Sequence, residues 1–128
     1  GSTSPTVRTT EIQIYGLDGA FLRSVSDGLR LPSALAVLGE QLIVAELTAR
    51  VAVLDGEDRV VCYLGVNDAA PARAGWPNSL DDEGRPIAPR DLRPGYFNSP
   101  HGLAVDTRGD LYVAEWMIGG RLTRLLRT

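Results

Sequence analysis

Two segments of this 128-residue chain repeat one another, and this internal repeat constrains the fold more than any other feature. The stretch LPSALAVLGEQLIVAEL (Leu31–Leu47) superposes on SPHGLAVDTRGDLYVAEW (Ser99–Trp116), with one extra residue in the turn of the second copy. A second pair, IQIYGLDGAFLRSV (Ile12–Val25) and VAVLDGEDRVVCYL (Val51–Leu64), superposes without a gap. Such a unit is one supersecondary element that buries its apolar surface only against neighbouring units.

The segments within the repeat have the pattern of short β-strands. Nine short runs are rich in Val, Ile, Leu and Tyr, and turn-forming stretches such as LDGA, DGED and DTRGD separate most of them. No stretch of comparable length has a sustained apolar period of 3.6 residues. The sequence therefore predicts an all-β chain of antiparallel strands, with four strands, named a to d, in each unit.

This unit divides the chain into segments. Residues 1–10 open with GSTSP and no methionine, and we expect them to be a tag scar with a flexible N-terminus. We expect strands c and d in 11–26, a full unit in 31–65, an insertion loop in 66–98, and strands a, b and c in 99–127. A four-stranded antiparallel unit recurring about every 40 residues is typical of a β-propeller blade.

The second copy of the unit resembles a known repeat. The pattern P-x-G-L-A-V-D-x-x-G-x-L-Y-V-A-E followed by GRLTRL resembles the NHL repeat, the blade of six-bladed propellers. The resemblance covers 11–65 and 97–126, although the first copy departs from it with Ser33-Ala34 and without the Asp-x-x-Gly turn. It implies a propeller scaffold that binds a small molecule or a protein, on a fold that serves many functions.

The number of strands also bears on assembly. Nine strands are too few to close a six-bladed ring, so we expect each chain to hold an incomplete ring, as a subunit or as a fragment without retained activity. Open ends expose strand edges, which proteins normally pair or cover. Three chains of two blades each would close head to tail, with strands c and d of one chain completing strands a and b of the next. We therefore expect a homo-oligomer, with a trimer favoured. The runs EIQIY and RLTRLL would then compete for one c position, and the sequence does not decide between them.

His101 is the single histidine of the chain and directly follows Pro100. The stretch F-x-x-P-H-G-L-A-V-D resembles the P-H-D segments of peptidyl-hydroxyglycine amidating lyases, which are propellers in which such histidines hold a catalytic zinc. This resemblance implies a metal role for His101 alone, because Ser33 stands at the matching position of the other copy. A trimer would bring three imidazoles around its axis, and three histidines with a water form a catalytic zinc site.

A structural role is the other interpretation of His101, which would then donate a hydrogen bond to the neighbouring blade. On that interpretation the chain needs no cofactor. Zinc shared between subunits remains the alternative, and with it a metal-dependent lyase or hydrolase of the amidating-lyase type.

The insertion contains the remaining aromatic candidates. In a propeller, the connection from strand d to the next strand a crosses one face of the ring, and long loops in compact domains are often functional. There Trp76, Tyr96 and Phe97 would line a ligand pocket, or would hold the insertion against the blades by packing. Ligand or protein binding on this face is the function that we expect.

Glu46 and Glu115 complete the candidate binding residues, because they end their b strands at equivalent positions. A carboxylate there could contact a ligand or transfer a proton. The simpler interpretation is an ion pair with Arg50 and Arg121, which open the following c strands.

Composition excludes several classes of function. The 13 basic and 16 acidic residues give a net charge of -3 and no basic surface for nucleic acid. No apolar run approaches the roughly 20 residues that cross a bilayer, and no stretch has the pattern of a secretory signal. We expect neither nucleic acid nor a membrane as a partner, and the compartment is not indicated.

Nucleophilic catalysis has no support in the sequence. There is no G-x-S-x-G elbow and no phosphate-binding glycine loop. The lone Cys62 cannot form an intrachain disulfide, and strand alternation predicts that it is a small core residue.

Overall fold

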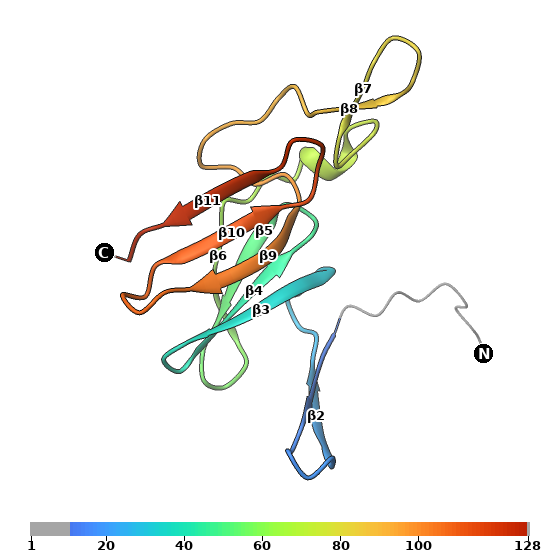
Figure 1. The fold of residues 1–128 in the computed structure, drawn as a ribbon. Coiled ribbons are helices and arrows are strands. Elements are labelled where there is room, and N and C mark those ends of the chain that lie inside the picture. Colours follow the sequence, from blue (N-terminus) through green and yellow to red (C-terminus); the bar gives the residue numbers. More distant parts are fainter. Residues whose placement is uncertain (1–10, 128) are drawn as a thin grey trace, which may run out of the picture.

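The computed structural model describes residues 11–127 (Figure 1), so the predicted tag scar at 1–10 lies outside the described residues. The prediction of an all-β chain is confirmed. Each of the nine predicted runs contains a strand, all strands pair in antiparallel sheets, and the described part of the chain has no α-helix. Accordingly, residues 11–127 include no helix with the length and apolar character needed to cross a membrane.

The strands form one hairpin and two larger sheets. The N-terminal hairpin pairs β1 (Ile12–Tyr15) with β2 (Phe21–Val25). The first sheet has the order β3 (Pro32–Leu38), β4 (Gln41–Glu46), β5 (Arg50–Leu54) and β6 (Val60–Leu64). The second sheet has the order β9 (Pro100–Val105), β10 (Leu111–Glu115) and β11 (Arg121–Leu125). Equivalent strands of the repeat thus hold equivalent positions in the two sheets, and β11 fills the contested third position of the second.

Aspartate side chains close the tight turns between strands. The Oδ1 atom of Asp55 accepts hydrogen bonds from the backbone N–H groups two and four residues later, at 2.8 and 3.0 Å, and lowers its own pKa by doing so. Asp106 makes the same pair of bonds at 2.9 and 3.0 Å. The Tyr112 hydroxyl also donates to Asp106 Oδ2 at 2.8 Å, and this bond is the largest cause of the lowered pKa of Asp106. These local bonds explain why turns form where the sequence predicts them.

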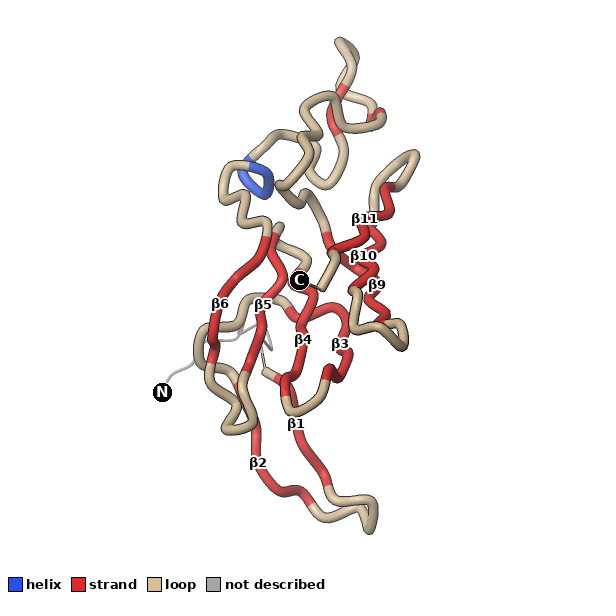
Figure 2. The backbone as a smooth tube through the Cα atoms, turned by 90° about the vertical axis from the view of Figure 1, so that its left-hand side faces the viewer, coloured by secondary structure: helices blue, strands red, loops and turns tan. Residues whose placement is uncertain are grey.

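The first sheet packs against other parts of the chain on both faces, although Leu35 and Val37 of β3 stay exposed. Alternation along its strands sends successive side chains to opposite sides. One face packs against the N-terminal hairpin and the residues that follow it, through Ile12, Val25, Leu29, Val44, Ala52 and Leu54. The other packs against the second sheet, through Ile43, Val51, Val53, Phe97, Leu111 and Val113. Figure 2 shows β9–β11 standing beside the four strands of the first sheet.

Cys62 lies on the surface, and its prediction as a core residue is wrong. It is paired with Val53 in the ladder between β5 and β6, and Val53 belongs to the face that packs against the second sheet. The second sheet, however, has three strands in the described part of the chain, where the first sheet has four. The side chain of Cys62 is exposed because no fourth strand of the second sheet covers it within residues 11–127.

The insertion, residues 66–98, is more regular than the predicted loop. It contains a 3₁₀ turn, η1 (Ala70–Ala72), and a hairpin of β7 (Ser79–Leu80) and β8 (Pro86–Ile87) that extends away from the two sheets (Figure 1). Arg73 anchors it by donating to Asn98 Oδ1 at 2.6 Å and to the Pro77 carbonyl at 3.1 Å. Two-residue strands are too short to produce an alternating pattern, so the sequence could not reveal them.

Candidate functional site

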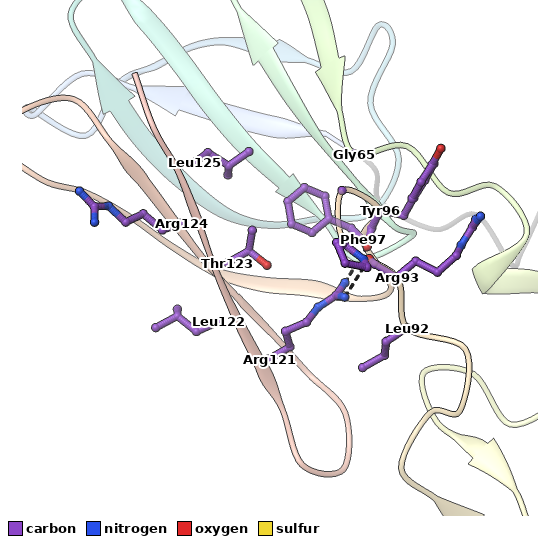
Figure 3. Close-up of a pocket in the computed structure, with 12 residues that line it drawn as sticks. Gly65, Leu92, Arg93, Tyr96, Phe97, Arg121, Leu122, Thr123, Arg124 and Leu125 are labelled. Atoms are coloured by element: carbon purple, nitrogen blue, oxygen red, sulfur yellow. Dashed lines mark hydrogen bonds between the residues drawn. The ribbon is translucent and has the colours of Figure 1, made fainter. Parts of the chain in front are cut away.

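A pocket of about 450 Å³ lies between β11 and the end of the insertion (Figure 3). It is lined by residues 121–125 on one side and 92–97 on the other, together with Gly65 at the end of the first sheet. We call these residues the edge groove, because β11 is the edge strand of the second sheet. Its volume lies within the range of about 300 to 1,000 Å³ that is usual for ligand sites.

Gly65 and Phe97 bring the insertion back to the first sheet. The N–H of Phe97 donates to the Gly65 carbonyl at 2.9 Å, and the Phe97 ring is buried between the sheets. Gly65 has φ of +61°, and a Cβ built there would lie 2.5 Å from that ring. Only glycine fits this close approach without strain.

Arg121 ties the insertion to the second sheet. Its Nε atom donates to Glu115 at 2.7 Å, and its two terminal nitrogens donate to the carbonyls of Arg93 at 3.1 Å and Tyr96 at 2.6 Å, the latter contacts being visible in Figure 3. One side chain thus couples a buried carboxylate, an edge strand and a loop. Arg121 therefore links the two walls of the groove directly.

Glu115 and Glu46 are buried and bonded to the protein's own donors. Glu115 Oε2 accepts the backbone N–H groups of Asn98 at 2.6 Å and Ser99 at 2.9 Å, while Oε1 accepts from Arg121. Glu46 accepts the backbone N–H of Arg30 and pairs with Arg50. The predicted ion pairs with Arg50 and Arg121 are confirmed. These carboxylates set the loop geometry in front of each a strand, and neither lines the edge groove.

The three aromatic candidates of the insertion have different positions. Tyr96 is exposed in the groove, and the Arg93 guanidinium lies 4.2 Å from its ring centroid. Phe97 lines the groove but belongs mainly to the core. Trp76 lies outside it, with Nε1 donating to the Asn98 carbonyl at 2.8 Å. The structure therefore places Tyr96 and Phe97 in the lining of the groove and Trp76 outside it.

His101 is exposed near the start of β9, away from the groove. Its ring centroid is 5.9 Å from that of Trp116, with an interplanar angle of 43°. In residues 11–127, no three His, Cys, Asp or Glu side chains lie together as metal ligands. One chain therefore does not fit the zinc of the amidating lyases. A site assembled from several copies stays a prediction.

Ser33, at the position equivalent to His101, forms a hydrogen bond between the two sheets. Its hydroxyl oxygen lies 2.8 Å from the Pro100 carbonyl oxygen, across the junction of the two sheets, and 3.0 Å from the Ala45 carbonyl oxygen, and the two carbonyls share its single proton. The alignment of the two repeats predicts the equivalence of Ser33 and His101, but not the hydrogen-bond partner of Ser33.

The groove is lined by basic side chains, two of which already pair with acidic residues, Arg121 with Glu115 and Arg124 with Asp110. Three arginines line it, Arg93, Arg121 and Arg124, and none of its lining residues is acidic. Arg121 and Arg124 belong to β11, where the sequence shows a spaced run of arginines, and Arg93 comes from the insertion.

Comparison with protein families agrees with the fold. The profile of the NHL repeat matches residues 97–116, which span the end of the insertion, β9 and β10. No curated protein matches the chain. The chain therefore contains an NHL repeat, a module of β-propeller-type binding scaffolds.

Proposed function

We propose that this chain is a β-propeller-type scaffold that binds a ligand or protein on the face carrying the insertion, and that further copies of the chain complete its ring. One observation carries this proposal. The two sheets of the chain pack face to face. The surfaces equivalent to the two sides of this contact are exposed elsewhere on the chain, one on β3 and the other on the second sheet.

The first of these surfaces is on β3. In the contact within the chain, Leu103 and Val105 of β9 are partly buried against the first sheet. The alignment of the repeats matches them with Leu35 and Val37 of β3, which are 48% and 69% exposed. The residues are identical in type and differ only in whether another sheet covers them. Exposed Leu and Val at such positions are typical of a surface awaiting a partner.

The other exposed surface is the face of the second sheet that does not pack against the first sheet. In the first sheet, Ile43 and Ala45 are fully buried. Their equivalents are Tyr112, which is partly exposed, and Ala114, which is exposed. A second copy placed with its β3 against β9 of the first copy would repeat the contact that the chain makes internally. Its N-terminal hairpin packs on the same face of its first sheet as Leu35 and Val37, so this placement requires the hairpin to move clear of β11.

His101 gains a role in this arrangement. Because Ser33 donates to the Pro100 carbonyl across the internal contact, the equivalent His101 would donate to the carbonyl of Pro32 in the next copy. This supports His101 as a contact residue between copies. Two sheets per chain and six blades per ring favour three copies, because a head-to-tail contact of this kind closes by rotation.

Light scattering on the purified chain, with a variant of β3, tests this proposal. The wild type is expected at three times the chain mass, and Val37→Glu is expected at a lower mass because it places a charge in the contact. Leu17→Glu is the matched control, since Leu17 is fully exposed in the turn of the N-terminal hairpin. A monomeric wild type, or equal masses for the two variants, would overturn ring completion by copies.

His101→Ser separates the contact role from zinc binding. We expect this variant to keep the wild-type mass, because serine already makes the contact at position 33. The metal content of the same peak is measured. Loss of bound zinc together with loss of mass would instead support a zinc site shared between subunits.

A further inference from the structure

We propose that the sulfur of Met117 is an oxidation site, and that its conversion to methionine sulfoxide by a peroxide loosens the insertion. Met117 is the single methionine of the chain and lies in the turn between β10 and β11. The consequence of this modification for ligand binding rests on the proposed role of the insertion face, but the modification itself does not.

The turn that contains Met117 contacts the insertion at two points. The N–H of Ile118 donates to Asn78 Oδ1 at 2.7 Å, and the Nδ2 atom of Asn98 donates to Met117 Sδ at 3.3 Å. Asn98 is 1% exposed, whereas Met117 is partly exposed, so a small oxidant in solution can approach it. Met117 therefore joins a buried amide to the surface of the chain.

The amide group of Asn98 anchors the insertion. Its oxygen accepts a hydrogen bond from Arg73 at 2.6 Å, which identifies the other terminal atom as the nitrogen. That nitrogen has two hydrogens but lies near three acceptors, which are the Pro77 carbonyl at 2.8 Å, Ser99 Oγ at 3.0 Å and Met117 Sδ at 3.3 Å. The thioether sulfur is the weakest acceptor of the three. In the reduced protein the two hydrogens are thus left mainly to the two oxygens.

Oxidation changes this competition. A lone pair of the sulfur attacks one oxygen of hydrogen peroxide, an S–O bond forms as the O–O bond breaks, and the second oxygen leaves with the remaining proton as water. The sulfur loses two electrons, which reduce the peroxide. The product is a polar side chain whose oxygen is a much stronger acceptor than the thioether sulfur.

A sulfoxide oxygen on the side of Asn98 does not fit the existing arrangement. A hydrogen bond from the Asn98 nitrogen to this oxygen needs about 2.7 to 3.2 Å, nearly the whole distance that now separates the nitrogen from the sulfur. The turn must then move away, or the amide must rotate and release the Pro77 carbonyl. An oxygen on the other side draws the sulfoxide toward water and away from Asn98. Each of these changes weakens the anchor of the insertion.

Limited digestion with trypsin, before and after treatment with hydrogen peroxide, tests the inference. Trypsin must bind the arginine side chain at the bond that it cleaves, and the side chain of Arg73 is 17% exposed and bonded to Asn98 and Asp91. Cleavage after Arg73 therefore reports release of the anchor. We expect oxidation of Met117, verified by peptide mass, to accelerate this cleavage about three- to tenfold, the effect of one lost hydrogen bond when cleavage follows the open population.

Two variants of Met117 assign the effect to its sulfur. Met117→Leu has a side chain of similar volume without the sulfur, and peroxide should leave its cleavage unchanged although it keeps the exposed Cys62 thiol. Met117→Gln carries a polar oxygen without oxidation and should be cleaved faster in the absence of peroxide. A methionine sulfoxide reductase should return the oxidised wild type to its original rate. Equal thermal unfolding temperatures of the wild type and Met117→Leu show that this variant is folded.

Three outcomes overturn the inference. A Met117 peptide of unchanged mass after peroxide treatment would exclude the modification. An oxidised Met117 with an unchanged rate of cleavage after Arg73 would exclude its coupling to the insertion. Equal acceleration in Met117→Leu would assign the effect to another residue, such as Cys62. None of these outcomes concerns the light-scattering masses of the wild type and Val37→Glu, so the proposed scaffold is tested separately.

Discussion

Replacing Glu115 by glutamine should lower the free energy of unfolding by about 2 to 3 kcal/mol. Glu115 is buried at the end of β10 and receives three donors, from the backbone of Asn98 and Ser99 and from the side chain of Arg121. The carboxylate fixes the entry of the chain into β9. Its loss therefore affects both the second sheet and the wall of the edge groove.

The magnitude follows from which bonds a glutamine keeps. Its single oxygen can replace Oε2 and retain both backbone donors, but its amide group then faces Arg121. A hydrogen bond to a charged group contributes about 1.5 to 3 kcal/mol, and breaking a fully buried ion pair costs about 3 to 5 kcal/mol. The side chain of Arg121 is 23% exposed and can regain water, which places the expected loss below the second range.

Urea unfolding followed by tryptophan fluorescence measures this loss. Both tryptophans report on the region, because Trp76 bonds the Asn98 carbonyl and the N–H of Trp116 bonds the Ser99 carbonyl at 3.0 Å. Glu57→Gln is the control, since its side chain is 75% exposed in an ion pair and should cost less than about 1 kcal/mol. If Glu115→Gln loses no more than this control at an unchanged m-value, the reasoning is refuted.

Three further predictions concern the groove, the open face and the turns. Gly65→Ala should destabilise the chain by about 1 to 3 kcal/mol in the same assay, through its positive φ and the contact with Phe97. Gly84→Ala, at φ of +78° with open space around it, isolates the backbone part and should cost less. Cys62 should react with an aromatic disulfide reagent in the folded protein, and a thiol protected until urea is added would contradict its exposure. Stability should decrease as the pH falls below about 4, because the pKa of Asp106 is lowered in the folded state. Its ionised form stabilises the fold above the unfolded pKa, and this contribution is lost on protonation. Thermal unfolding between pH 6 and pH 3 measures the decrease, which should be smaller in Asp106→Asn.

Local patterns explain the part of the fold that was predictable. Strands and turns follow from alternation and from aspartates that bond their own backbone, as at Asp55 and Asp106. The ion pairs of Glu46 and Glu115 were predictable because each arginine opens the strand paired with the strand that its glutamate ends. The β7–β8 hairpin was not, because its two-residue strands carry no period.

Repetition and alternation are properties of neighbouring residues, so the sequence by itself determined the all-β class, the four-strand unit and the order of strands along the chain. Exposure and charge in space depend on what covers a side chain, and the sequence does not contain that information locally. Only the tertiary structure decided that Cys62 is exposed, that β11 holds the third position of its sheet, and that Arg121 bonds the carbonyl of Arg93 across one groove. Leu35 and Leu103 show the difference most directly: the repeat gives them the same residue type and position, and the sheet packed against only one of them decides which is covered.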